Sequence, residues 1–144
     1  MDPQNSQPHS AEMAHVLLMD IVGYSRLPMT RQREVLHRLQ AAVQSTRDFV
    51  RARQRDQLIS LPTGDGMALV FFRDPEAPVR CALDLGRVVR PLPELQLRRG
   101  LHTGPVYRVA DINSNSNVSG SGINVAQRVM DCGDNGHIDR KSVV

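Results

Sequence analysis

Hydrophobic residues gather in short runs that alternate with segments of helical periodicity. The run HVLLMDIVGY at 15–24 is apolar and rich in β-branched residues, which is typical of a buried strand. Apolar residues then recur at a helical period with arginines on the other faces, so we expect one long amphipathic helix from Arg31 to about Arg51, capped by Thr30. A further helix is predicted across 75–90, where prolines stand at its start.

The remaining apolar runs predict paired strands. LISLPTGDGMALVFF at 58–72 holds two apolar runs joined by Gly-Asp-Gly, a strong hairpin signal. LQLRRGLHTGPVYRV at 95–109 predicts two more strands that turn at Thr-Gly-Pro, and INSNSN at 112–117 predicts a loop. A last helix is expected across 119–132 and a last strand from 136. This order favours an α+β sandwich with a mostly antiparallel sheet and helices on one face.

Composition fits a single soluble globular domain. The chain has 144 residues, of which 40% are hydrophobic and 23% charged, and its net charge is +3. With no Trp and few Phe or Tyr, it lacks stacking platforms for nucleic acid, so we expect no nucleic-acid partner. Its two cysteines, Cys81 and Cys132, are too few for a disulfide framework and are expected to be buried thiols.

The beginning of the chain predicts no membrane segment or secretory signal. Residues 1–12 are polar and are expected to form a disordered leader, with one domain over 13–144. No apolar run reaches the roughly 18 residues that a membrane helix requires. We therefore expect a cytoplasmic location and no membrane association of this chain.

Two acidic residues stand where strands end. Asp20 closes the first strand, and because burying a carboxylate is costly, we expect it to be paired, bound to a cation or at the rim of the sheet. Asp65 lies at the hairpin tip, where an Asp-Gly pair can also serve only the turn. If the first strand lies beside the hairpin, the two carboxylates meet, an arrangement that holds Mg²⁺ together with substrate phosphates. Gly23 would then let backbone amides close on a polyphosphate.

A polar pair occupies the last predicted helix. Asn124 and Arg128 are four residues apart and therefore share one face. Together they can hold a hydroxyl oxygen and a phosphoryl oxygen, although an exposed polar pair would show the same spacing.

Four motifs in sequence resemble a known family. HVLLMDIVGYS, TGDGMALVF, LRRGLHTGPVYR and NVSGSGINVAQRVM with CGDNGHI occur in order over about 14–138 and resemble the catalytic domain of class III nucleotidyl cyclases, the adenylate and guanylate cyclases of bacterial type. The resemblance implies a ferredoxin-like α+β fold and a homodimer with active sites at its interface. It also implies conversion of a nucleoside triphosphate, with ATP as the expected substrate, into the 3′,5′-cyclic monophosphate and pyrophosphate for intracellular signalling.

The resemblance also assigns site residues. Two divalent cations, Mg²⁺ or Mn²⁺, would be held by Asp20, Ile21 and Asp65. Asn124 and Arg128 would be the catalytic pair, supplied by the opposite subunit to position the ribose and stabilise the transition state. The triphosphate would bind the backbone amides of Ile21, Val22, Gly23, Tyr24 and Ser25.

The base pocket departs from the family pattern. Adenylate cyclases typically read adenine with a lysine and with an aspartate or threonine at two positions that here are Leu61 and Asn117. Leu61 cannot hydrogen-bond a base, and Asn117 offers both a donor and an acceptor. A cyclase that uses GTP or a pyrimidine nucleotide therefore remains an alternative, as does a non-catalytic cyclase-like domain that dimerises and senses a nucleotide.

The C-terminal end departs as well. Family domains continue past the strand at 136–138 into another helix and a hairpin with a phosphate-binding lysine. Lys141 lies too early to be that lysine. The resemblance thus implies that the catalytic domain over 13–144 is incomplete at its C-terminus.

Overall fold

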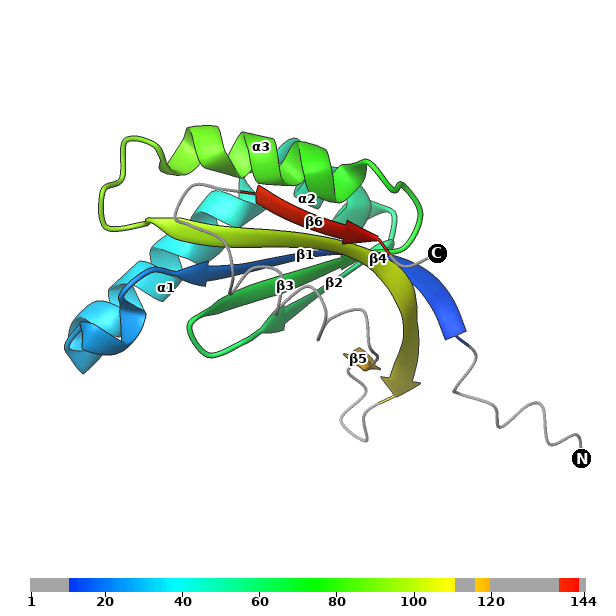
Figure 1. The fold of residues 1–144 in the computed structure, drawn as a ribbon, viewed down its shortest axis with the longest axis horizontal. Coiled ribbons are helices and arrows are strands. Elements are labelled where there is room, and N and C mark those ends of the chain that lie inside the picture. Colours follow the sequence, from blue (N-terminus) through cyan, green and yellow to red (C-terminus); the bar gives the residue numbers. More distant parts are fainter. Residues whose placement is uncertain (1–10, 111–115, 120–137, 143–144) are drawn as a thin grey trace, which may run out of the picture.

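The protein folds into a sheet with a layer of helices on one face (Figure 1). The structure is a computed structural model that describes the backbone of residues 11–110, 116–119 and 138–142 and the side chains of residues 12–106. The strands span Ala11–Ile21 (β1), Leu58–Pro62 (β2), Gly66–Phe71 (β3), Leu97–Ala110 (β4), Ser116–Ser119 (β5) and Ile138–Ser142 (β6). Their order in the sheet is β2-β3-β1-β4-β5, and β6 pairs with β4. This architecture confirms the expected α+β fold class.

The sheet is mostly antiparallel. β1 pairs antiparallel with both β3 and β4, and the β2–β3 hairpin forms as expected. β6 alone runs parallel to its neighbour among the described strands.

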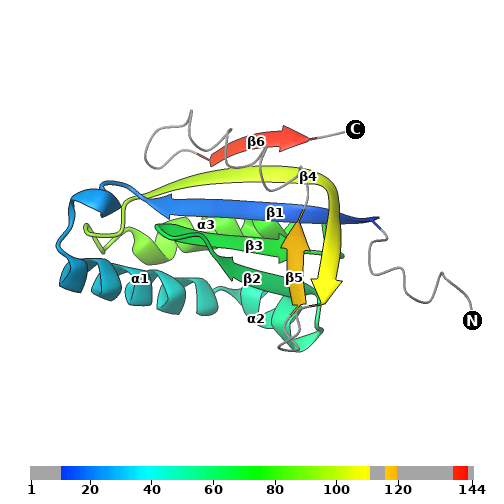
Figure 2. The same cartoon turned by 90° about the horizontal axis from the view of Figure 1, so that it is seen from below.

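Within the described part of the chain, three α-helices cover one face of this sheet (Figure 2). Side chains of a strand alternate between its two faces, so Leu17, Met19 and Ile21 of β1 enter the core beneath the helices. Val16 and Leu18 belong to a second buried cluster on the opposite face. The helices span Met29–Gln44 (α1), Arg47–Gln54 (α2) and Ala77–Val89 (α3), and a 3₁₀ turn, η2, spans Tyr24–Arg26.

The prediction of a single long helix from Arg31 is wrong, because this segment forms two helices, α1 and α2. The Ser45 hydroxyl donates to the Ala42 carbonyl at 2.6 Å, and the Thr46 hydroxyl donates to the Val43 carbonyl at 2.7 Å. Such local bonds compete with the helical ladder, and Thr46 adopts an extended backbone. The start also differs, since α1 begins after Pro28, so Thr30 lies inside its first turn instead of capping it.

The prediction of a turn at 103–105 is also wrong, because these residues belong to the single strand β4. Pro105 lies between the part of β4 that pairs with β6, which ends at Thr103, and the part that pairs with β5, which begins at Tyr107. On that side of β4 the missing N–H of proline interrupts no ladder between described strands. The loop predicted at 112–117 is wrong at Ser116 and Asn117, which belong to β5, and the rest of that range lies outside the described residues.

Other expectations hold or lie outside the described part of the chain. The helix predicted across 75–90 is α3, and the last strand is β6. The expected leader at 1–12 is wrong at residues 11 and 12, which belong to β1. Residues 1–10 lie outside the described ones, as does most of the helix predicted at 119–132.

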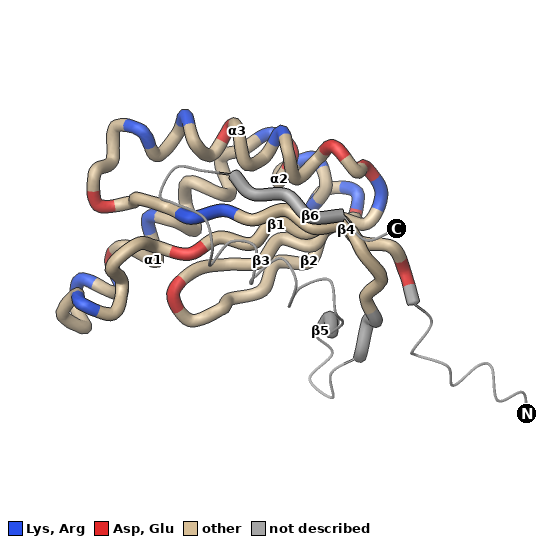
Figure 3. Tube along the Cα trace, in the orientation of Figure 1, with Lys and Arg blue, Asp and Glu red and all other residues tan. Residues whose placement is uncertain are grey.

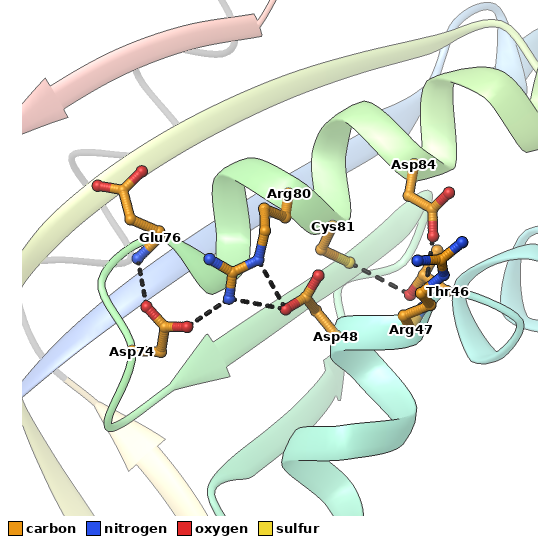
Figure 4. A network of polar contacts seen from close by, with 8 residues as sticks. All are labelled: Thr46, Arg47, Asp48, Asp74, Glu76, Arg80, Cys81 and Asp84. Carbon is orange, nitrogen blue, oxygen red and sulfur yellow. Dashed lines mark hydrogen bonds and ion pairs between the residues drawn. The ribbon is translucent and has the colours of Figure 1, made fainter.

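Polar contacts join α2 to α3 within the helix layer (Figure 4). The Arg80 guanidinium donates to Asp48 at 2.9 and 3.1 Å and also to Asp74. Cys81 is buried beside the Thr46 hydroxyl at 3.4 Å, and this burial raises the pKa of the Cys81 thiol to about 11. Cys81 is therefore a buried thiol as expected, whereas Cys132 lies outside the described residues.

Candidate functional site

The end of β1 and the tip of the β2–β3 hairpin meet at one corner of the sheet. The Ile21 N–H donates to the Asp65 carbonyl at 2.9 Å, and Asp20 lies opposite Gly66 in the β1–β3 register. In Figure 3 the acidic segments at the end of β1 and in the hairpin turn lie near each other and near a basic stretch of β4. The strand pairing thus confirms that the first strand lies beside the hairpin, which was the condition for the two carboxylates to meet, and the cation site itself stays a prediction.

A tight turn brings Asp65 to this corner. The Thr63 N–H donates to the Gly66 carbonyl at 3.2 Å, which leaves a two-residue loop of Gly64 and Asp65. Gly64 has a φ of 89°, as the first loop position of a type II′ turn requires. A Cβ at Gly66 would lie 1.9 Å from the Met19 carbonyl oxygen, so only glycine permits this approach of β3 to β1.

Asp20 is held by an ion pair with two hydrogen bonds. Arg98 on β4 lies directly opposite it and donates through Nε to Oδ1 at 3.0 Å and through Nη2 to Oδ2 at 2.7 Å. Asp20 is only 3% exposed, whereas the Arg98 side chain is 30% exposed. The carboxylate is therefore paired, one of the three expected outcomes. Sequence reasoning missed Arg98, because the only signal is a cross-strand register between residues far apart in the chain.

The loop after β1 turns sharply at Gly23. This residue has a φ of 74°, a left-handed conformation that favours glycine, and it precedes η2. The Ile21 amide already donates to Asp65, and the Val22 amide donates to the Gln96 carbonyl at 2.8 Å. Two of the five expected triphosphate-binding amides, those of Ile21 and Val22, thus already donate to backbone carbonyls. The amides of Gly23, Tyr24 and Ser25 are therefore the remaining candidates for binding the triphosphate.

The oxygen atoms at this corner suit a hard divalent cation. Two carboxylates from Asp20 and Asp65 and the backbone carbonyl of Ile21 are ligands of the kind that Mg²⁺ and Mn²⁺ prefer. Each Asp20 oxygen accepts from Arg98 and keeps a further lone pair. No group of three or more His, Cys, Asp or Glu side chains is placed to hold a metal among the described residues, so the fit rests on two carboxylates.

The expected base-pocket residues lie on strands that touch. Leu61 on β2 is half-buried and packs against the cluster of Val16, Leu18 and their neighbours on the face away from the helices. Asn117 lies on β5, which contacts β2, and its side chain is outside the described ones (Figure 2). Leu61 therefore presents an aliphatic surface and no hydrogen-bonding group at its position.

The expected catalytic pair stays a prediction. Asn124 and Arg128 both lie outside the described residues. Nothing in the described part of the chain brings them to the Asp20 corner or separates them from it.

Comparison with known proteins finds structural relatives. No protein-family model and no curated protein matches the chain. The guanylate cyclase domain of RhGC from Catenaria anguillulae, solved in complex with GTP, is 23% identical over 88% of this chain and 76% of that chain, with a TM-score of 0.70. The adenylate/guanylate cyclase/hydrolase from Silicibacter pomeroyi is 25% identical over 90% and 75%, with a TM-score of 0.62.

A third relative has the same fold. The guanylyl cyclase domain of the RhoGC fusion protein from the aquatic fungus Blastocladiella emersonii is 20% identical over 91% of this chain and 81% of that chain, with a TM-score of 0.71. The chain thus has the fold of adenylate and guanylate cyclase catalytic domains, which confirms the resemblance seen in its motifs.

Within the described residues, no helix has the length and apolar character to cross a membrane.

Proposed function

We propose that the chain is the catalytic domain of a nucleotide cyclase, a lyase that converts a nucleoside triphosphate into its 3′,5′-cyclic monophosphate and pyrophosphate. The observation that carries this proposal is the meeting of Asp20 and Asp65 where β1 ends beside the hairpin turn, in a chain with the cyclase fold. The reaction is the in-line attack of the ribose 3′-oxygen on the α-phosphorus, with pyrophosphate as the leaving group.

Asp20, Asp65 and the Ile21 carbonyl would hold two divalent cations, Mg²⁺ or Mn²⁺, in the proposed site. Such cations activate the attacking hydroxyl and offset the charge of the triphosphate. The chain itself contributes rigidity, because Arg98 fixes both oxygens of Asp20 and the main chain at Ile21 fixes the turn that carries Asp65. The Asp20 carboxylate and the backbone that carries Asp65 are thereby positioned before substrate arrives, which lowers the entropic cost of binding.

The triphosphate would lie on the turn that follows β1. The amides of Gly23, Tyr24 and Ser25 begin the η2 turn, where the first N–H groups of a helix have no partner within it. Donors of this kind, arranged in a tight turn, favour phosphate oxygens. Arg98, partly exposed beside Asp20, adds positive charge at the same corner.

Asn124 and Arg128 of a second subunit would complete the site in a homodimer. The asparagine would orient the ribose and the arginine would stabilise charge on the reacting phosphoryl group. We place the domain in the cytoplasm, where nucleoside triphosphates are its substrates and the cyclic product serves signalling.

ATP is the expected substrate, with weak discrimination against GTP. Specificity for a base requires directional groups that leave the wrong base unpaired. Leu61 supplies none, and the amide of Asn117 suits either a donor or an acceptor. We therefore expect a preference for ATP over GTP of less than about a hundredfold, roughly the effect of one or two hydrogen bonds.

The aliphatic side chain at position 61 also favours a second candidate, a cyclase-like domain that binds nucleotide without converting it. The two candidates differ in product. Purified protein is offered ATP, GTP, CTP and UTP separately and in equal mixture, with Mg²⁺ or Mn²⁺, and the products are identified by mass spectrometry. The proposal expects a cyclic monophosphate and pyrophosphate in equal amounts, with cyclic AMP ahead in the mixture. Nucleotide binding without any cyclic product would support the second candidate and contradict the first.

A further inference from the structure

An arginine occupies a core-facing position on β4. Leu97 and Leu101 belong to the core beneath the helices, and strand alternation puts Arg99 on the same face between them. Arg99 is only 7% exposed, and its Nη1 donates to the Ala82 carbonyl of α3 at 2.6 Å. Its neighbour Arg98 points the opposite way, toward Asp20. Arg99 thus places a positive charge beneath the helices, away from Asp20 and the proposed nucleotide site.

The overlying helix is shaped to accept this guanidinium. Gly86 lies on α3, and a Cβ added there would come within 2.7 Å of Arg99 Nη1. Glycine is unfavourable inside a helix by roughly 1 kcal/mol relative to alanine, so its place here needs a local reason. The absent side chain at Gly86 gives the Arg99 head group room between β4 and α3.

Arg99 lines a large cavity. This cavity has a volume of about 710 Å³ and is bounded by the second half of α3, the segment that connects α3 to β4, and the start of β4. The charged side chains among its described lining residues are Arg87, Arg90 and Arg99. The apolar part of the lining includes Leu83, which is more than half exposed, together with Val89, Leu92 and Leu97.

We propose that this cavity binds a small organic anion, in which a phosphate or carboxylate group is attached to an apolar body. The anionic group would lie against Arg99 with Arg87 and Arg90 around it, since charge-assisted bonds from guanidinium groups are strong and suit these oxygens. The apolar body would cover the leucine and valine side chains, as in ligand sites that combine apolar walls with a few directed polar groups.

Burial supports the choice of an anion. Desolvation lowers the pKa of Arg99, although arginine still stays charged at neutral pH. An anion beside a desolvated cation gains more than it would beside a hydrated one, because the local dielectric constant is low. The anion-binding arginine is distinct from the proposed cation site, because Arg99 contacts α3 on the helix side of β4, whereas Arg98 and Asp20 pair on the other side.

Titration of the ¹⁵N-labelled protein with hexyl phosphate and with hexanoate, followed by NMR, tests this proposal. We expect saturable shifts of amides in 83–99 that border the cavity. The Arg99→Met variant should bind at least about tenfold more weakly, the loss expected for one charge-assisted hydrogen bond. The Arg90→Gln variant should also bind more weakly and, because Arg90 is exposed, serves if Arg99→Met fails to fold. Arg33→Gln, which removes the same charge from an exposed position on α1, is the matched control and should bind as the wild type does.

Four results would overturn the proposal. The first is no saturable binding of either anion to the wild type. The second is equal binding of uncharged hexanol, which would make the cavity merely apolar. The third is equal weakening by Arg33→Gln, which would assign the binding to net charge. The fourth is a set of shifts confined to residues 21–25, which would assign the anions to the proposed nucleotide site. None of these results would contradict the proposed cyclase activity, so the two proposals can fail separately.

Discussion

A side chain at position 66 would occupy the space of the Met19 carbonyl oxygen, so this glycine decides how closely the hairpin approaches β1. Gly66→Ala should destabilise the protein by about 2 kcal/mol or more, because backbone atoms cannot move aside as side chains can. Urea unfolding measures the change. Thr63→Ala, an exposed position in the same hairpin, is the control and should change the free energy of unfolding by less than about 0.5 kcal/mol. A Gly66→Ala protein of wild-type stability would show that β1 and β3 lie further apart than described.

The ion pair of Asp20 with Arg98 predicts an asymmetry between its partners. Arg98→Met leaves a buried carboxylate without its cation and should cost roughly 3 kcal/mol. Asp20→Asn should cost clearly less, since the partly exposed guanidinium of Arg98 can be hydrated. The double variant should be more stable than Arg98→Met alone, because the uncompensated charge is gone. Chemical denaturation of the three variants measures this cycle, and equal costs for both single changes would contradict the account.

The side-chain contacts between α2 and α3 make the free energy of unfolding depend on pH. Arg80 on α3 links Asp48 at the start of α2 to Asp74 before α3, and its hydrogen bond is the main cause that lowers the pKa of Asp74. Because the pKa of Asp74 is lower in the folded state, the stabilisation is present above the ordinary carboxyl pKa of about 4 and is lost as the pH falls through the folded value.

Arg80→Met should therefore destabilise the protein by about 1–2 kcal/mol at pH 7 and by less near pH 2.5. The estimate is modest because the Arg80 side chain is half exposed and solvent weakens its ion pairs. Unfolding curves at the two pH values measure the difference. Arg87→Met, on the same helix, is the control and should have little effect, since its contact with Asp84 is 3.5 Å long and exposed. A penalty for Arg80→Met that grows toward acid pH would contradict the assigned network.

The outcome of sequence reasoning also differs by element. The hairpin at 58–72 and helix α3 are predictable because their signals are local: a turn between apolar runs and a proline at a helix start. The break at Ser45 and Thr46 depends on hydroxyl groups bonding the preceding carbonyls, which periodicity does not detect. The unbroken β4 depends on which neighbours lie beside Pro105, and that is a property of the sheet.

At the scale of the whole molecule, the same distinction holds for the candidate site. The meeting of the end of β1 with the hairpin turn could be predicted, because both have local signals and the family motifs include Asp20 and Asp65. Arg98 could not, because its pairing with Asp20 joins β4 to β1 across 78 positions of sequence. Arg99 and its cavity were missed for the related reason that two adjacent arginines look alike in sequence, although alternation sends them to opposite faces.

A site shared between two subunits predicts complementation. Asp20→Ala and Arg128→Ala proteins should each be inactive, and mixing them should restore part of the activity, because one interface of the heterodimer keeps both intact halves. Cyclic nucleotide formation in the mixture is measured after subunit exchange has been verified by mass. No recovery despite exchange would mean that one chain supplies the whole site.

Two Asp→Asn changes in turns at opposite ends of β2 test most directly whether the corner with Asp20 and Asp65 is the catalytic centre. Asp65→Asn keeps a residue that suits the turn, so the fold should persist, but it removes one of the two carboxylates. Asp56→Asn is the matched control, since Asp56 has a φ of 54°, a conformation that Asn tolerates, and it is exposed. With Mn²⁺ and ATP, Asp65→Asn should form cyclic AMP at least about a thousandfold more slowly than the wild type, as expected when a cation site worth several kcal/mol is lost. Mn²⁺ binding should weaken in parallel, and Asp56→Asn should match the wild type in both measurements. Wild-type turnover by Asp65→Asn would contradict the claim that the two carboxylates at this corner form the catalytic centre.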